Sequence, residues 1–163
     1  MEKNYNVTEQ DKVFMREAIR LANESCENGG GPFGAVIVKD GEIVAGASNS
    51  VTIDNDPTAH AEVNAIRKAC KKLGTFDLTG CVVYTSCEPC PLCLGALYWA
   101  HIKKIYYGNS KKDAADIDFA DDFIYAELAK PYHLRNIPMI HILSDEAIST
   151  FKKWTAKSDK TEY

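Results

Sequence analysis

The chain lacks the features of membrane-spanning, repetitive and strongly basic proteins. It contains no run of about 18 apolar residues, the length that a membrane-spanning helix needs, and no internal repeat or low-complexity segment. Its 19 lysine and arginine residues are outnumbered by 23 aspartate and glutamate residues, which gives a net charge of −4. No overall positive field attracts nucleic acid to such a surface. We therefore expect neither a membrane nor a nucleic acid among the partners of this protein.

An apolar secretory core is also missing, because Met1–Tyr5 lead directly into a polar, helix-like stretch. Six cysteines without such a signal indicate a reducing compartment, where closely spaced thiols are more often ligands or catalysts than disulfides. We therefore expect a cytoplasmic protein. With 163 residues, 45% of them hydrophobic and 26% charged, the chain has the size and composition of one globular domain over residues 1–163.

The spacing of apolar residues predicts an α/β fold. Five helices are predicted: from Thr8 to the glycines at 29–31, from Asp56-Pro57 to Leu73, and over 92–101, 123–129 and 145–154. Five strands are predicted: 35–38 and 43–45 on either side of an Asp40-Gly41 hairpin turn, then 82–85, 105–107 and 139–143. After the hairpin, strands and helices alternate. We therefore expect a central sheet with helices on both faces.

One group of residues carries a recognisable chemistry: His60-Ala61-Glu62 and, after 26 intervening residues, Pro89-Cys90-Pro91-Leu92-Cys93. An imidazole and two thiolates are three ligands for a tetrahedral zinc ion, whose fourth position stays open for water. Glu62, beside the histidine, can carry protons. The order H-x-E … P-C-x-x-C is typical of zinc deaminases, in which activated water replaces an amino group on a ring carbon.

The spacing within each motif predicts how these side chains meet. Residues at i and i+2 point to nearly opposite sides of a helix, so His60 and Glu62 can both reach an ion only if it lies beyond the helix end. Cys90 and Cys93, at i and i+3, face one side at the start of the next helix. Two helix N-termini then direct their positive ends at one point, which favours the thiolates.

Other interpretations of the cysteines remain open at this point. Cys87, Cys90 and Cys93 form two C-x-x-C pairs that share Cys90, and the proline before Cys90 favours Cys90 with Cys93 as the ligands. Cys87 then either supports the ligands from beside them or serves only for packing. A redox-active C-x-x-C pair would explain neither His60 nor Glu62. A closed structural zinc site would need a fourth protein ligand, for which the candidates are Cys87, His101, His133 and His141.

Around these motifs the chain resembles the zinc-dependent cytidine and nucleobase deaminase superfamily, and within it the branch of short guanine deaminases. Three segments carry the resemblance, which continues more weakly through 121–125 to the C-terminal Glu-Tyr: GGPFGAVIVKDG (30–41), NDPTAHAEV (55–63) and YTSCEPCPLCLGALYWA (84–100). The resemblance implies a three-layer α/β/α sandwich with a five-stranded mixed sheet. It also implies one zinc ion per subunit and a homodimer in which residues from about 131 to 163 are exchanged. The implied reaction is hydrolysis of guanine to xanthine and ammonia.

The same resemblance assigns roles to individual residues. His60, Cys90 and Cys93 would hold zinc, and Glu62 would transfer protons. The other assignments are Asn49 for hydrogen bonding to the base, Phe33 for packing on the purine face with Trp99 nearby, Asp121 as a second proton carrier with Asp122 as its rival, and Tyr163 as a lid residue. Without the resemblance, Phe33 and Trp99 would be expected in the core, Asn49 in a turn, and Asp121 and Tyr163 at the surface.

Three other functions remain as alternatives. A tRNA adenosine deaminase shares the zinc motif and binds a nucleotide flipped out of its loop, although the acidic composition counts against it. A deaminase of another aminated base or nucleoside would need only a different pocket. A zinc-binding scaffold without catalytic activity would keep the metal and use it to bind a partner.

Overall fold

A computed structural model describes residues 6–163 of the protein, so the interpretation of Met1–Tyr5 as part of a leaderless N-terminus lies outside the described residues. The chain divides after Asp122 into two compact units, the second of which is Phe123–Tyr163. None of the helices between residues 6 and 163 has the length and apolar character needed to cross a lipid bilayer.

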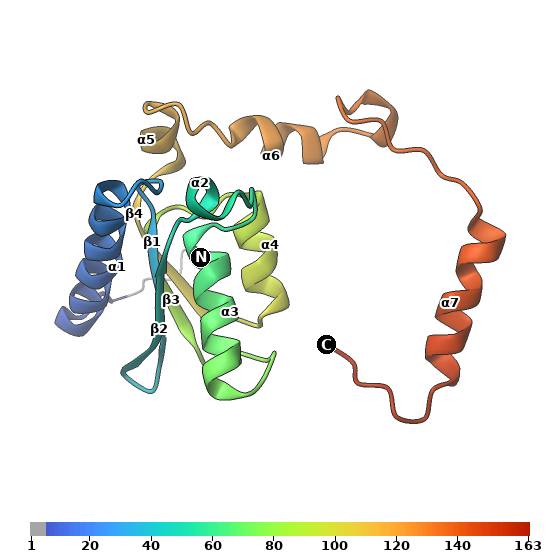
Figure 1. Ribbon diagram of the computed structural model, residues 1–163, viewed down its shortest axis with the longest axis horizontal. Coiled ribbons are helices and arrows are strands. Elements are labelled where there is room, and N and C mark those ends of the chain that lie inside the picture. The colour runs from blue at the N-terminus through green and yellow to red at the C-terminus, as the bar shows by residue number, and fades with distance from the viewer. Residues whose placement is uncertain (1–5) are drawn as a thin grey trace. The chain divides into compact units, whose positions relative to one another are not determined.

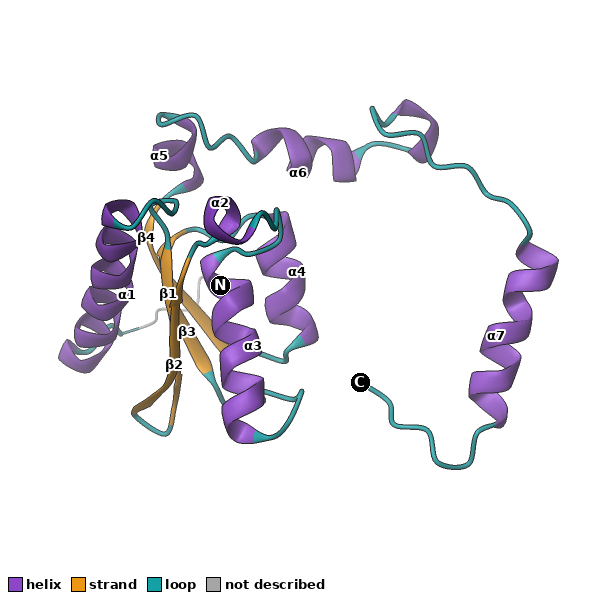
Figure 2. Ribbon diagram, viewed as in Figure 1, coloured by secondary structure: helices purple, strands orange, loops and turns teal. Residues whose placement is uncertain are grey.

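A four-stranded sheet forms the centre of the first unit (Figure 2). Its strands are β1 (Gly34–Lys39), β2 (Glu42–Ser48), β3 (Val82–Cys87) and β4 (Lys104–Asn109), in the order β2-β1-β3-β4. β1 pairs antiparallel with β2 and β3, whereas β3 and β4 are parallel, so the sheet is mixed. The hairpin turns at Asp40 and Gly41, whose φ angles of 51° and 81° are those that the predicted turn requires.

Helices cover both faces of this sheet (Figure 1). Because side chains alternate along a strand, Ala35 and Ile37 of β1 lie in one buried cluster and Val36 in another. The first cluster includes Leu97 and is covered by α3 (Ala61–Leu73) and α4 (Pro91–Trp99). The second includes Phe14 and is covered by α1 (Glu9–Glu27). The α/β class and the mixed sheet predicted from the sequence are therefore confirmed.

The start of α3 differs from the prediction. The helix begins at Ala61, with His60 as its N-cap, and not at Asp56-Pro57. The Asp56 carboxylate instead accepts hydrogen bonds from the Thr58 backbone N–H and hydroxyl at 2.8 and 2.7 Å. Aspartate closes such local turns as readily as it caps a helix, and Asp56 forms the turn in this structure. A short helix that was not predicted, α2 (Val51–Asp54), precedes this turn.

Other helix ends follow the predicted signals. Thr8 caps α1 through a reciprocal pair of hydrogen bonds with Asp11, and α3 ends at Gly74, which has a φ of 67°. After β4 comes a second short helix that was not predicted, α5 (Lys111–Ala115).

The second unit contains helices but no strand. α6 (Asp122–Ala129) leads into it, followed by η1 (Tyr132–Leu134) and α7 (Ser144–Ala156), which confirms the helices predicted at 123–129 and 145–154. The strand predicted at 139–143 is wrong, and the described sheet has four strands rather than five. A strand needs a neighbour for its backbone hydrogen bonds, and the second unit offers none. Ile140 and Ile142 are 82% and 70% exposed.

Candidate metal centre

Three predicted ligands meet at the N-terminal ends of two helices. His60 is the N-cap of α3, Cys90 is the N-cap of α4, and Cys93 lies in the first turn of α4. The His60 Nδ1 atom is 3.5 Å from Cys90 Sγ and 3.4 Å from Cys93 Sγ. A tetrahedral zinc ion with ordinary bond lengths would separate a nitrogen from a sulfur ligand by about 3.6 Å. The three side chains therefore fit a zinc ion, with Nδ1 as the coordinating nitrogen.

No further side chain belongs to this group. Within residues 6–163, the histidine, cysteine and carboxylate atoms placed closely enough to hold a metal ion come from His60, Cys90 and Cys93. Cys87 is buried nearby, with its Sγ 3.8 Å from the Ser110 carbonyl oxygen, and burial raises the pKa of its thiol to about 11. A set of three protein ligands leaves one tetrahedral position for water or substrate.

The ligands influence each other's protonation strongly. A hydrogen bond from Cys93 is the largest of the influences that lower the pKa of Cys90 to about 4, and His60 contributes in the same direction. The neighbouring Cys90 thiolate raises the pKa of His60, and the hydrogen bond to Cys90, with burial, raises the pKa of Cys93. A cation that binds all three groups therefore displaces protons from the cluster.

Glu62 lies beside the ligands, and a residue of the central sheet holds its carboxylate through a hydrogen bond. It sits in the first turn of α3 with 6% of its surface exposed, and its Oε1 accepts a hydrogen bond of 2.8 Å from the Thr85 hydroxyl. Burial raises the pKa of this carboxyl, and the Thr85 hydrogen bond opposes the shift. A carboxyl group beside an activated water can both accept and return a proton.

Thr85 was missed by the sequence reasoning. A signal was present, since two hydroxyl residues, Thr85 and Ser86, follow the apolar and aromatic residues 82–84 of the strand. Burial of such a hydroxyl requires a partner. The identity of that partner, 23 residues away in the chain, depends on the tertiary structure.

Asp121 carries a buried oxygen whose hydrogen-bonding capacity is unmet. Its Oδ1 has no hydrogen-bond partner among the described residues. Burial raises the pKa of this carboxyl, and the charge on Cys90 adds to the shift. The Asp121 carboxylate is thus close enough to Cys90 for the charge of that ligand to affect its pKa. These features favour Asp121 over its neighbour Asp122, which lies in the first turn of α6.

Asn49 is fixed at the end of β2 by contacts to its main chain and side chain. Ser25 donates to the Asn49 carbonyl oxygen at 3.0 Å, and the Asn49 Oδ1 accepts from the Val51 N–H at 3.2 Å. A Cβ atom at Gly30 would lie 2.5 Å from the Asn49 backbone carbonyl oxygen, so only glycine fits there. Asn49 is therefore a rigidly placed, buried amide rather than a simple turn residue.

Phe33 lies just before β1 and packs against the cluster under α3 and α4. Its ring meets that of Phe119 edge to face, with 5.0 Å between the centroids and an interplanar angle of 87°. Phe119 was also missed by the sequence reasoning. It is the one aromatic residue within the acidic run 116–122, and that isolation was the only available signal.

The last two predicted site residues, Trp99 and Tyr163, are both exposed. Trp99 ends α4 and is 68% exposed, so the expectation of a core position, drawn from the apolar helix alone, is wrong. It lies about 9 Å along the helix axis from Cys93, at 1.5 Å per residue. Tyr163 ends the second unit and is 75% exposed. Their roles toward a substrate stay predictions.

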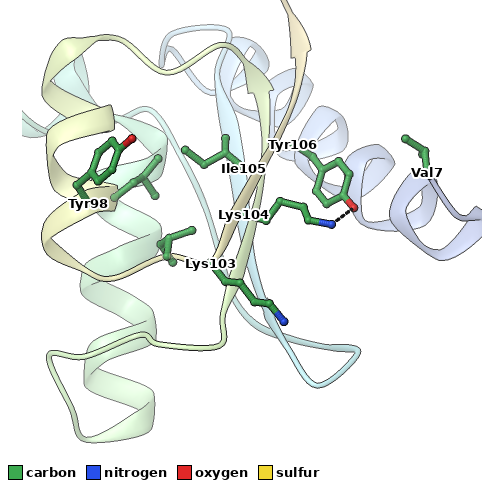
Figure 3. A pocket seen from close by; sticks show the side chains of 8 residues that line it. Val7, Tyr98, Lys103, Lys104, Ile105 and Tyr106 are labelled. Atoms are coloured by element: carbon green, nitrogen blue, oxygen red, sulfur yellow. Dashed lines mark hydrogen bonds between the residues drawn. The ribbon is translucent and has the colours of Figure 1, made fainter. Parts of the chain in front are cut away.

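A separate cavity of about 500 Å³ lies between α4 and β4 (Figure 3). Its lining includes Val7, Tyr98, Lys103 and Ile105, and none of the zinc ligands. The wall nearest Val7 is formed in part by Tyr106, whose hydroxyl accepts a hydrogen bond of 3.1 Å from Lys104.

Known proteins resemble this chain over the metal centre and beyond it. Guanine deaminase from Bacillus subtilis strain 168 is 53% identical over 153 residues, which is 93% of this chain and 98% of that protein. The X-ray structure of guanine deaminase from Bacillus subtilis covers the same shares with a TM-score of 0.91. The tRNA-specific adenosine deaminase of Bacillus subtilis strain 168 is 43% identical over 61% of this chain and 62% of its own length.

The family assignment rests on the segment that contains the site. Residues 8–109 match the cytidine and deoxycytidylate deaminase zinc-binding region, and this range includes all three ligands and Glu62. The matched region is also more than half of the chain. With the converging histidine and cysteine side chains described above, it shows that the chain belongs to the zinc-binding cytidine and deoxycytidylate deaminase family.

Proposed function

We propose that this protein hydrolyses guanine to xanthine and ammonia. One observation carries the proposal: the 53% identity to a guanine deaminase covers 93% of the chain and so includes most of residues 123–163. The similarity to a tRNA-specific adenosine deaminase stops at 61% of the chain. Zinc-binding deaminases share the first part of this chain, and the agreement over the remainder favours guanine as the substrate.

Zinc held by His60, Cys90 and Cys93 would supply the Lewis acid that makes a water molecule nucleophilic near neutral pH. Glu62 accepts one proton from the attacking water and passes it to the ring nitrogen beside C2. It then takes the second proton of that oxygen and delivers it to the departing amine. The bond between guanine C2 and its exocyclic nitrogen breaks, and a bond from C2 to the oxygen of water forms. Asp121 is proposed to assist the departure of ammonia. Its carboxyl pKa is raised, and its buried Oδ1 has no hydrogen-bond partner among the described residues.

The remaining predicted residues would bind and cover the base. Asn49 is proposed to hydrogen-bond guanine through its amide, which can both donate and accept. Phe33 is proposed to pack on the purine face, supported by its fixed contact with Phe119. Trp99 and Tyr163 are proposed, from the family resemblance, as a pocket wall and a lid.

We also infer a homodimer in which residues from about 131 to 163 are exchanged between two copies of a single deaminase domain. The exposed apolar side chains of the second unit support this inference, because water disfavours such a surface. The cavity beside α4 and β4, whose lining combines apolar side chains with two tyrosines and two lysines, offers one surface to a second copy (Figure 3). A three-layer arrangement is supported by α1 on β1 and β3, and by α3 on β1 and β2. A cytoplasmic location stays a prediction from the cysteine content.

A spectral assay across several bases tests the proposed reaction. Purified, zinc-loaded protein is given guanine, adenine, cytosine and their nucleosides, and the zinc content of the same sample is measured. We expect xanthine from guanine and little change in the other compounds. Unchanged guanine in a zinc-loaded sample that deaminates another base would contradict the proposal.

A tRNA adenosine deaminase is the second candidate, because the chain is 43% identical to one over 61% of its length. That activity would require tRNA binding that weakens steeply with salt, since phosphate contacts dominate such affinity. We expect no salt-sensitive binding of tRNA by this protein, whose net charge is −4.

A further inference from the structure

Thr85 places a hydroxyl group on the buried face of the central strand β3. Its side chain is fully buried, and the neighbour on the same face of the strand, Val83, belongs to the apolar cluster under α3 and α4. A valine at position 85 would fill nearly the same volume without a polar atom. A buried hydroxyl costs free energy unless it is hydrogen-bonded, so packing alone does not explain a threonine here.

The hydroxyl finds its partner in the carboxylate of Glu62. Thr85 Oγ1 donates to Glu62 Oε1 at 2.8 Å, and both side chains are buried. Hydrogen bonds to a charged carboxylate are shorter and stronger than those between neutral groups. The branched side chain of threonine has few rotamers, so its hydroxyl points in a defined direction, whereas glutamate has three rotatable side-chain bonds.

The strand that carries Thr85 is held on both sides. Thr85 is paired with Ala35 of β1 and with Tyr107 of β4 in the sheet register. The same strand ends at Cys87, three residues before the ligand Cys90. One rigid element therefore orients the proton carrier and leads directly into the loop that presents the cysteines.

We propose that Thr85 is a positioning residue for deamination. Its hydroxyl holds the Glu62 carboxylate in the orientation in which it can transfer protons beside the His60, Cys90 and Cys93 cluster. This inference rests on the proposed function, because it assigns Thr85 to the proton carrier of that reaction. In this role Thr85 acts through Glu62 and not on the base. It fixes the direction in which the Glu62 oxygens face the attacking water and the departing amine.

Two substitutions separate the hydroxyl from the volume of the side chain. Thr85→Val removes the hydroxyl and keeps the shape, whereas Thr85→Ser keeps the hydroxyl and removes a methyl group. We expect Thr85→Val to lower kcat by about 10- to 100-fold, the range for a lost hydrogen bond to a charged group, with KM and zinc content within twofold of wild type. We expect Thr85→Ser to retain kcat within about threefold.

Val83→Ala is the matched control, because it opens a cavity on the same face of β3 without touching Glu62. We expect it to lower the melting temperature while leaving kcat within about threefold. Introduced into Glu62→Gln, the Thr85→Val change should cause no further loss of kcat, since two residues that act as one unit are not additive. An equal loss in both backgrounds, or failure of Thr85→Ser to retain kcat, would overturn the inference.

A crystal structure of Thr85→Val provides a readout that does not depend on the substrate. We expect the Glu62 carboxylate to leave the position it has in wild type while His60, Cys90 and Cys93 stay in place. An unmoved carboxylate would overturn the positioning role. If the wild-type protein deaminates another base but not guanine, only the proposed substrate is contradicted. The positioning role of Thr85 can then be tested by comparing kcat of each variant with that of wild type on the base that the protein accepts.

Discussion

The two units of the chain differ in what their apolar side chains touch. In the described residues, buried apolar side chains lie between Phe14 and Ala114, within the first unit. In the second unit Ile137, Ile140 and Phe151 are 80%, 82% and 70% exposed. Burial therefore determines the structure of the first unit, which holds the metal-binding group and Glu62. The second unit exposes apolar side chains, and an exposed apolar surface of this kind is typical of an interface with another protein surface.

The largest effect is expected from the chemistry that the first unit holds. Glu62→Gln keeps the shape of the side chain and its hydrogen bond with Thr85, but it removes the proton carrier. We expect kcat for guanine to fall by about 10²- to 10⁴-fold, the usual contribution of general acid–base catalysis. Steady-state kinetics and zinc analysis on one preparation check this result.

The zinc content of Glu62→Gln should stay within twofold of wild type, because the ligands are untouched. A non-catalytic zinc scaffold predicts that the change affects neither the metal nor any activity. Loss of zinc with full turnover would contradict the roles given to both the ligands and Glu62.

A pair of apolar substitutions compares the two units directly. Leu97→Ala removes a fully buried side chain from the first unit, and we expect a loss of about 2–5 kcal/mol in the free energy of unfolding. Ile142→Ala changes a side chain that is 70% exposed, and we expect a loss within about 0.5 kcal/mol at low protein concentration. Urea unfolding of both variants measures the difference.

Protein concentration sharpens this comparison. If a second copy covers the second unit, Ile142→Ala should become destabilising as concentration rises, because dimer stability depends on concentration. The Leu97→Ala effect should be large at every concentration. An Ile142→Ala effect that is equally small throughout would count against the exchanged dimer.

The proposed dimer can be tested with substitutions confined to the second unit, which contains none of the three zinc ligands. Ile140→Asp with Ile142→Asp places two charges on the exposed segment of the second unit. We expect the weight-average mass in sedimentation equilibrium to shift from about two chains toward one, since a buried unpaired charge is costly. An unchanged dimer would place its interface elsewhere, and a monomeric wild-type protein would refute the exchange.

The smallest expected effect concerns acid stability at the start of α1. Burial of Asp11 is outweighed by hydrogen bonds from Tyr84 and Thr8, so the pKa of this carboxyl lies below its usual value of 3.8. Because the folded pKa is lowered, the stabilisation is present above pH 3.8 and is lost as pH falls through the folded pKa. Asp11→Asn should destabilise the protein more at pH 7 than at pH 3. Urea unfolding at both pH values checks this, and an equal effect at both would contradict the assignment.

Much of the first unit could be predicted because local signals and burial agree there. The positive φ angles that a two-residue hairpin demands made Asp40-Gly41 a reliable turn. The motif spacings predicted that the ligands would lie at two helix starts, and His60 and Cys90 are the N-caps of those helices. The start of α3 could not be predicted, because Asp56 is equally suited to cap a helix or to close a turn.

What the sequence could not provide depends on partners distant in the chain. The run 139–143 has the composition of a strand, but a strand forms only beside another, and its own unit has none. The contacts of Thr85 with Glu62 and of Phe119 with Phe33 join residues 23 and 86 positions apart. No periodicity or motif encodes such pairs.

X-ray absorption at the zinc edge of the purified protein tests the metal centre most directly. The geometry of His60, Cys90 and Cys93 predicts two sulfur neighbours at about 2.3 Å, one imidazole nitrogen, and one further light atom in the open position. Three sulfur neighbours would place Cys87 among the ligands and close the site. That result would contradict the proposal that zinc activates water here.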